Sequence, residues 1–115
     1  MKQWIVIGLC VLTSNVFAEA CMLTSKPGEF PNKSCMQNAG APSAVFNDFC
    51  DGAGDEANIM TKLENCPKQS IATCEIKLNG VDGKFVQHVY TSSLLKAYEL
   101  SCKNNMAGKG VWTLK

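Results

Sequence analysis

Apolar and polar side chains alternate most regularly in the second half of the chain. Over residues 71–78 every second side chain is apolar, which is the period of a half-buried β-strand. Two dipeptides that favour tight turns, Asn-Gly and Asp-Gly, follow within residues 79–83. A run rich in Val, Tyr and Phe then covers residues 85–91. The pattern predicts a β-hairpin made of these two runs.

Two other segments have apolar residues at the spacing of a helix. Within residues 42–51, four apolar side chains fall on one helical face, with Pro42 in the first turn and Gly52 after the last. A second helix is expected to start at a cap formed by Ser92 or Ser93 and to end near Asn104, Asn105 and Gly108.

The rest of the chain has weaker patterns. Residues 55–65 fit a helix or a strand, and residues 111–114 fit a short closing strand. Residues 21–41 contain Pro, Gly and Asn with little periodicity and are expected to be irregular. No internal repeat is visible. The order of elements predicts one α+β domain, a small disulfide-stapled antiparallel hairpin or sheet packed with two or three short helices.

The N-terminus has the three parts of a secretory signal peptide. A lysine follows Met1, nine apolar residues occupy positions 4–12, and small residues follow. That run is too short to span a bilayer, which takes about 20 residues. Two cleavage positions remain open, after Ala18 and after Ala20.

Residues 1–20 are therefore expected to be a signal peptide and residues 21–115 a single disulfide-rich domain. This predicts a secreted or periplasmic protein without a membrane span. Cleavage after Ala20 would leave Cys21 first, as in a lipoprotein, but Glu19 is a poor residue before a lipidated cysteine. We do not expect a lipid anchor on Cys21.

The cysteine count gives the strongest chemical signal. Of seven cysteines, Cys10 lies in the apolar run and would leave with the signal peptide. An even number in a short exported chain predicts a framework of three disulfides, whose connectivity is open among fifteen possibilities. The close pairs typical of zinc sites and redox motifs are absent. The six remaining cysteines are Cys21, Cys35, Cys50, Cys66, Cys74 and Cys102.

Charge and composition argue against nucleic acid as a partner. The formal net charge is +1, and the eleven basic residues are all lysine, so neither net charge nor guanidinium chemistry favours nucleic acid. The charges are unevenly distributed, with five acids and one lysine within residues 42–66 and five lysines and two acids within residues 82–115. Such segregation can orient a protein partner.

Candidate catalytic and metal-binding residues are few. His88, the single histidine, lies in an expected strand with no acidic residue within four positions on either side, and we expect it to be a structural residue. The acidic segment 51–56 departs from a calcium loop, since Ala53 and Glu56 stand where a ligand and a glycine are required. No two carboxylates are marked as a catalytic pair. We expect no catalytic residue, no cofactor and no metal.

The stretch from Cys50 to Trp112 resembles small exported cysteine-rich proteins of uncharacterised bacterial families. The resemblance is carried by Cys66-Pro67, by Cys74 opening a strand, and by a helix with Cys102 before a Gly-aromatic ending at 110–112. It implies a secreted domain and transfers no functional residue.

These observations predict a non-enzymatic exported protein that binds a protein or a cell-envelope component. One alternative is a periplasmic inhibitor or immunity protein directed against a cell-wall hydrolase or toxin, because a small bridged fold binds without a large ordering cost. A second alternative is a small secreted hydrolase or toxin.

Overall fold

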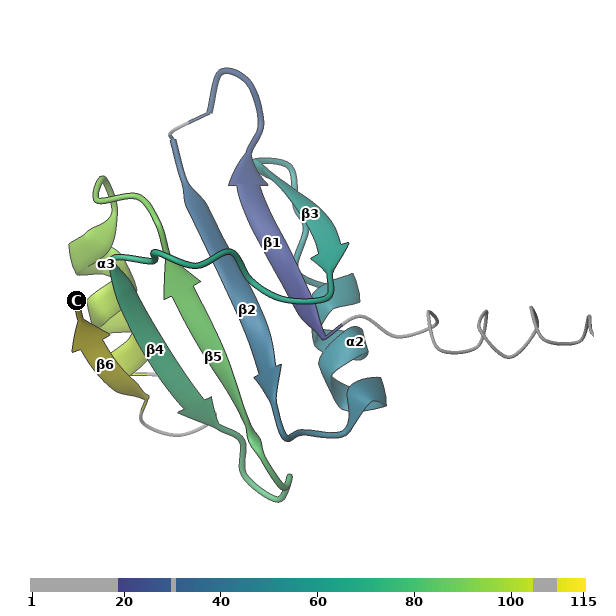
Figure 1. The fold of residues 1–115 in the computed structure, drawn as a ribbon. Coiled ribbons are helices and arrows are strands. Elements are labelled where there is room, and N and C mark those ends of the chain that lie inside the picture. The colour runs from purple at the N-terminus through teal and green to yellow at the C-terminus, as the bar shows by residue number, and fades with distance from the viewer. Residues whose placement is uncertain (1–18, 30, 105–109) are drawn as a thin grey trace, which may run out of the picture.

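A computed structural model describes residues 19–29, 31–104 and 110–115. These residues form a six-stranded antiparallel sheet in the order β3-β1-β2-β5-β4-β6, with two helices (Figure 1). The strands are β1 Ala20–Ser25, β2 Lys33–Ala39, β3 Asn58–Leu63, β4 Ala72–Lys77, β5 Lys84–Val89 and β6 Val111–Leu114; the helices are α2 Ser43–Asp51 and α3 Leu95–Lys103. Within these residues no helix is long and apolar enough to cross a membrane. The expected signal peptide falls almost entirely outside them.

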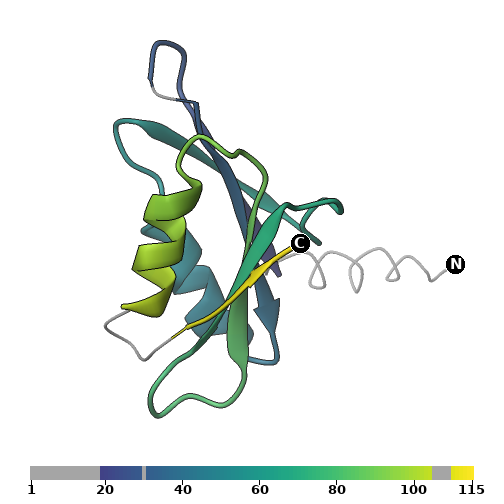
Figure 2. The same ribbon diagram turned by 90° about the vertical axis from the view of Figure 1, so that its left-hand side faces the viewer.

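Both helices pack on the same face of the sheet, as the edge-on view shows (Figure 2). Under α2 the core is built on Phe46 and Phe85, whose rings meet edge to face with centroids 5.1 Å apart. Under α3 a second cluster surrounds Ile76, with Trp112 half-buried against it. The opposite face is crossed by the connection between β3 and β4, residues 64–71 (Figures 1 and 2).

Several expectations are confirmed. The hairpin is β4 and β5, and its turn contains Gly80 and Gly83 at φ angles of 73° and 85°. These left-handed conformations strongly favour glycine. The first helix is α2, which follows Pro42 and ends before Gly52. The closing strand is β6.

The expectation that residues 21–41 are irregular is wrong, because this segment supplies β1 and β2. Strand β1 pairs with β3 on one side and β2 on the other. Its first three residues are all buried, so no alternation is visible in the sequence. The prolines and glycines lie in the connections, in the turn around 26–32 and at Gly40 after β2.

Two other points are resolved or corrected. The ambiguous segment 55–65 contains a strand, β3. The last helix has no serine cap, since its N-cap is Leu94 and the Ser93 hydroxyl donates instead to the carbonyl of Pro31, 2.9 Å away. The α+β description holds only in part, because the described residues form mostly sheet, with two helices. Of the residues expected to end this helix, Asn104 is its C-cap, whereas Asn105 and Gly108 lie outside the described residues.

The six cysteines form three disulfides, as expected, and the structure now fixes their connectivity. Cys21 of β1 bonds to Cys50 of α2, and Cys74 of β4 bonds to Cys102 of α3. Both helix cysteines are buried. The third bond, Cys35–Cys66, links β2 to the segment 64–71, which crosses the face opposite the helices. Each disulfide therefore joins the sheet to a different covering element.

The structure contains a repeat of secondary-structure elements that is not visible in the sequence. The order strand–strand–helix–strand occurs twice, as β1-β2-α2-β3 and as β4-β5-α3-β6. The two units contribute β3-β1-β2 and β5-β4-β6 to the sheet, in mirror order. Each has a disulfide from its first strand to its helix, with sequence separations of 29 and 28 residues.

The strand register independently supports this repeat. In the first unit Cys21 pairs with Met36, and in the second Cys74 pairs with Gln87. Met36 and Gln87 are thus equivalent, and they also pair with each other where β2 meets β5. An approximate two-fold axis therefore passes between these two residues, at the middle of the sheet.

Candidate functional site

An apolar pocket opens on the helix-covered face, where the two repeated units meet. Its volume is about 450 Å³, within the range of natural ligand pockets. Both units line the pocket. The first unit supplies Met36, Val45, Asp48 and Phe49, and the second supplies Ile76, Leu78 and Phe85. No single segment of the sequence carries this site, because it forms only when β2, β4 and β5 are side by side beneath α2.

Phe49 is the aromatic residue on the rim of this pocket. It is 41% exposed, and its ring centroid lies 5.4 Å from that of Phe85, which is almost fully buried. Phe49 lies one position before the disulfide-bonded Cys50, so the bond to β1 fixes the helix that carries the ring. An exposed aromatic side chain on a rigid support is typical of the residues that dominate binding energy at interfaces.

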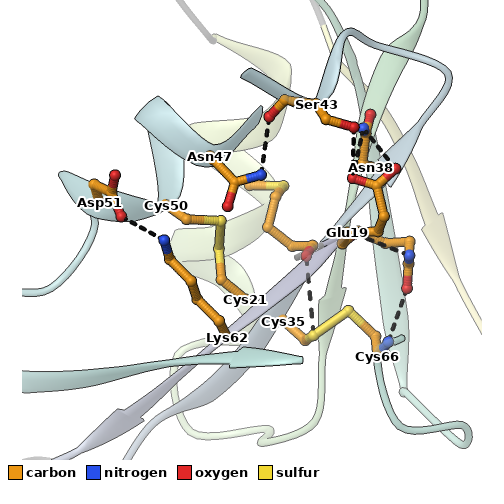
Figure 3. The surroundings of a disulfide bond; sticks show 12 residues. Glu19, Cys21, Cys35, Asn38, Ser43, Asn47, Cys50, Asp51, Lys62 and Cys66 are labelled. Atoms are coloured by element: carbon orange, nitrogen blue, oxygen red, sulfur yellow. Dashed lines mark hydrogen bonds and ion pairs between the residues drawn. A yellow bond between two sulfur atoms is a disulfide. The ribbon is translucent and has the colours of Figure 1, made fainter. Parts of the chain in front are cut away.

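The charge beside the pocket is negative. Asp48 lines it, and no ion pair to Asp48 is present among the residues with defined positions. Asp51, one turn further along α2, is paired with Lys62 at 2.7 Å (Figure 3). Exposed acids continue at Asp55 and Glu56. Of these acids, Asp48 is the one that lines the pocket.

The acidic segment 51–56 is organised by hydrogen bonds within the turn. Asp55 Oδ1 accepts the backbone N–H groups of Ala57 and Asn58, both at 2.8 Å, and these bonds lower the pKa of Asp55. One carboxylate oxygen thus serves as a turn acceptor. In the part of the chain that can be placed, no group of three or more His, Cys, Asp or Glu residues is suited to hold a metal ion.

A second polar cluster lies on the opposite face, around His88 of β5. The Ser70 hydroxyl is 3.1 Å from His88 Nδ1, and Lys115 Nζ donates to the same hydroxyl oxygen at 3.0 Å. A lysine ammonium can only donate, and a hydroxyl oxygen has two acceptor lone pairs, so the direction of the Ser70–His88 hydrogen bond is set by the tautomer of the ring. Burial, and secondarily the charge of Lys115, lower the pKa of His88 below its ordinary value of 6.5. The ring is therefore neutral at pH 7.

This Ser–His contact has the partners of a nucleophile and a base, but not their access. Ser70 is 5% exposed, so a substrate carbonyl would reach its oxygen only if the crossing segment moved. The hydroxyl instead fixes that segment to β5, together with the Tyr90 hydroxyl, which donates to the carbonyl of Pro67 at 2.5 Å. Sequence reasoning missed this contact, because Ser70 and His88 are 18 residues apart.

The comparisons with known proteins give no match. No family model, no curated protein and no solved structure matches the chain. The resemblance to small exported cysteine-rich bacterial proteins therefore stays a prediction.

Proposed function

We propose that the protein is exported, to the periplasm or beyond, and acts there as a non-enzymatic binding protein. The expected compartment follows from the signal-peptide pattern and from three disulfides, which persist where the surroundings are oxidising. The partner is a protein that inserts an apolar side chain into the pocket between the two units and places a lysine or arginine beside it.

The observation that carries this proposal is the combination of an open apolar pocket and a half-exposed Phe49 on its rim. Leaving both in water is unfavourable, and burying Phe49 would recover part of the 1.5–3 kcal/mol that is typical of a fully buried large apolar side chain. The positive charge on the partner is argued from Asp48, which lines the pocket without an ion pair among the placed residues. Charge complementarity of this kind increases the rate of association.

The alternative of an inhibitor or immunity protein is a special case in which the partner is an enzyme, such as a cell-wall hydrolase or a toxin. The rigid attachment of α2 through Cys21–Cys50 favours it, because a preorganised surface loses little entropy on binding. For the other alternative, a small hydrolase or toxin, the described residues offer the Ser–His pair of Ser70 and His88, and the burial of Ser70 argues against a catalytic role for that pair.

A photo-crosslinking experiment tests the proposal. A benzophenone amino acid is placed at Phe49 or, as the matched control, at Leu100 of α3, which is 52% exposed and does not line the pocket. Cells that export the protein are then irradiated. We expect an adduct from position 49 and none from position 100. The proposal would be contradicted if no adduct formed at position 49, or if equal amounts of adduct formed at both positions.

A second measurement uses the crosslinked partner in purified form. Phe49→Ser should weaken its affinity at least tenfold, whereas Leu100→Ser should change it less than twofold, since few interface residues carry most of the binding energy. Both variants are checked by thermal unfolding. If the partner is an enzyme whose activity falls on addition of the protein, the inhibitor alternative is selected. Clearing of a cell-wall or protein substrate by the protein alone would instead select the hydrolase.

A further inference from the structure

Glu19 is built into the folded domain through all of its oxygen atoms (Figure 3). Its backbone carbonyl accepts the Asn38 N–H at 2.8 Å and the Gln37 side-chain amide at 3.0 Å. Its carboxylate accepts the Ser43 hydroxyl at 3.2 Å and lies 3.4 Å from the Asn38 side-chain nitrogen. Glu19 therefore connects the end of β2 to the first residue of α2.

The two residues after Glu19 are buried more deeply. Ala20 is 0% exposed and pairs with Gln37 on one side and Leu63 on the other. Cys21 is 2% exposed and carries the disulfide to α2. An α-ammonium group at Cys21 would place a charge within this buried strand, which is costly when the charge has no partner.

We infer that the export protease cuts between Ala18 and Glu19, so that Glu19 is the first residue of the mature protein. Water hydrolyses this peptide bond, leaving a carboxylate on Ala18 and an amino group on Glu19. The bonds that anchor Glu19 use its oxygen atoms, so they persist when its nitrogen becomes a terminal amine. Cutting after Ala20 would remove those bonds and the buried Ala20. The inference rests on the export proposed above.

The same geometry excludes lipidation of Cys21. A lipoprotein thioether forms on the cysteine sulfur, whereas this sulfur is bonded to Cys50. A lipidated Cys21 would leave Cys50 with a free thiol, and Cys50 is 0% exposed in the core. The mature protein is therefore released without an acyl chain.

The test is the mass of the full chain after export with its own leader, measured without reduction and then after reduction and alkylation. We expect residues 19–115 with three disulfides. An exported protein that begins at Cys21, or carries a diacylglyceryl mass, would overturn the inference and leave export intact. A protein retained in the cytosol with Met1 would overturn both proposals, so the two failures are distinguishable.

A leader variant makes the test specific to this bond. Val16 is three residues before the proposed cut, where a small uncharged residue is needed, and has no such place in the frame that ends at Ala20. Val16→Asp should therefore abolish the 19–115 product. Asn15→Asp adds the same charge one position earlier, outside the critical positions of both frames, and should be processed normally. If Val16→Asp is processed like Asn15→Asp, the cut is elsewhere.

Discussion

Removing the disulfides one at a time should separate two contributions to stability. One is the lower conformational entropy of the bridged unfolded chain, and the other is the packing of the sulfur atoms in the folded protein. The three bonds close loops of nearly equal length, with sequence separations of 29, 31 and 28 residues. The chain-entropy relation then gives each about 3.6 kcal/mol of stabilisation at 25 °C. Because this contribution is common to the three, differences between the variants report on the native environment of the sulfur atoms.

Those environments differ. Both cysteines are buried in Cys21–Cys50 and in Cys74–Cys102, whereas Cys66 is partly exposed. Replacing a buried cysteine with alanine loses the transfer free energy of the sulfur and leaves a small cavity, about 1 kcal/mol for each. The Cys35→Ala/Cys66→Ala variant should therefore lose about 1 kcal/mol less than either of the other two double variants.

The assay is equilibrium unfolding in urea, with all variants in the same concentration of sulfate, which strengthens apolar burial and keeps weak variants folded. A thiol assay on each native variant must first find no free thiol, so that the remaining bonds are those of the parent. Two results would refute the reasoning. The first is that the Cys35/Cys66 variant has the lowest free energy of unfolding. The second is that the free energies of the other two variants differ from each other by more than they differ from that of the Cys35/Cys66 variant.

Three further predictions concern single residues. Gly110→Ala should lower the free energy of unfolding by about 2 kcal/mol, because its Cβ would lie 2.7 Å from both sulfur atoms of the adjacent disulfide. Gly52→Ala, whose Cβ meets nothing closer than 3.9 Å, is the control, and equal urea midpoints would contradict this. His88 has its pKa lowered on folding, so the unfolded chain binds its proton more readily and stability should fall as pH drops through 6.5; His88→Gln should flatten that part of the profile, and an unchanged slope would argue against it. Asn38→Ala should cost about 2 kcal/mol in urea unfolding, since its amide makes two 2.9 Å hydrogen bonds to the backbone three residues on; a cost below about 0.5 kcal/mol would show that these bonds matter little.

The sequence predicted those elements whose two faces differ in exposure. Strand β4 alternates between buried and accessible residues, so its period is visible. Strand β1 begins with three buried residues, because α2 covers one face and the crossing segment covers the other. A strand covered on both faces loses the period-two signal. The repeat was also not visible in the sequence, because the two units share little more than the positions of the cysteines that join the first strand to the helix.

The candidate site was less accessible to sequence reasoning than the fold. Its walls come from residues as distant as Met36 and Phe85, and what joins them is the pairing of β2 with β5. The acidic character of residues 42–66 was visible in the sequence, and the structure places Asp48 at the pocket. The apolar half of the site has no local signature, because core residues and pocket residues have the same composition.

The pattern of disulfides determines what a single proteolytic cut would do. The loops closed by Cys21–Cys50 and Cys35–Cys66 overlap, so one cut anywhere between Cys21 and Cys66 leaves a single covalent molecule. One cut within residues 67–73, for example after the exposed Lys68, instead yields two chains with no covalent bond between them. These two chains are the two repeated units. Their association would depend on the pairing of β2 with β5 and on concentration. The nicked protein would be a dissociable heterodimer of two similar subunits, with the pocket at the subunit interface.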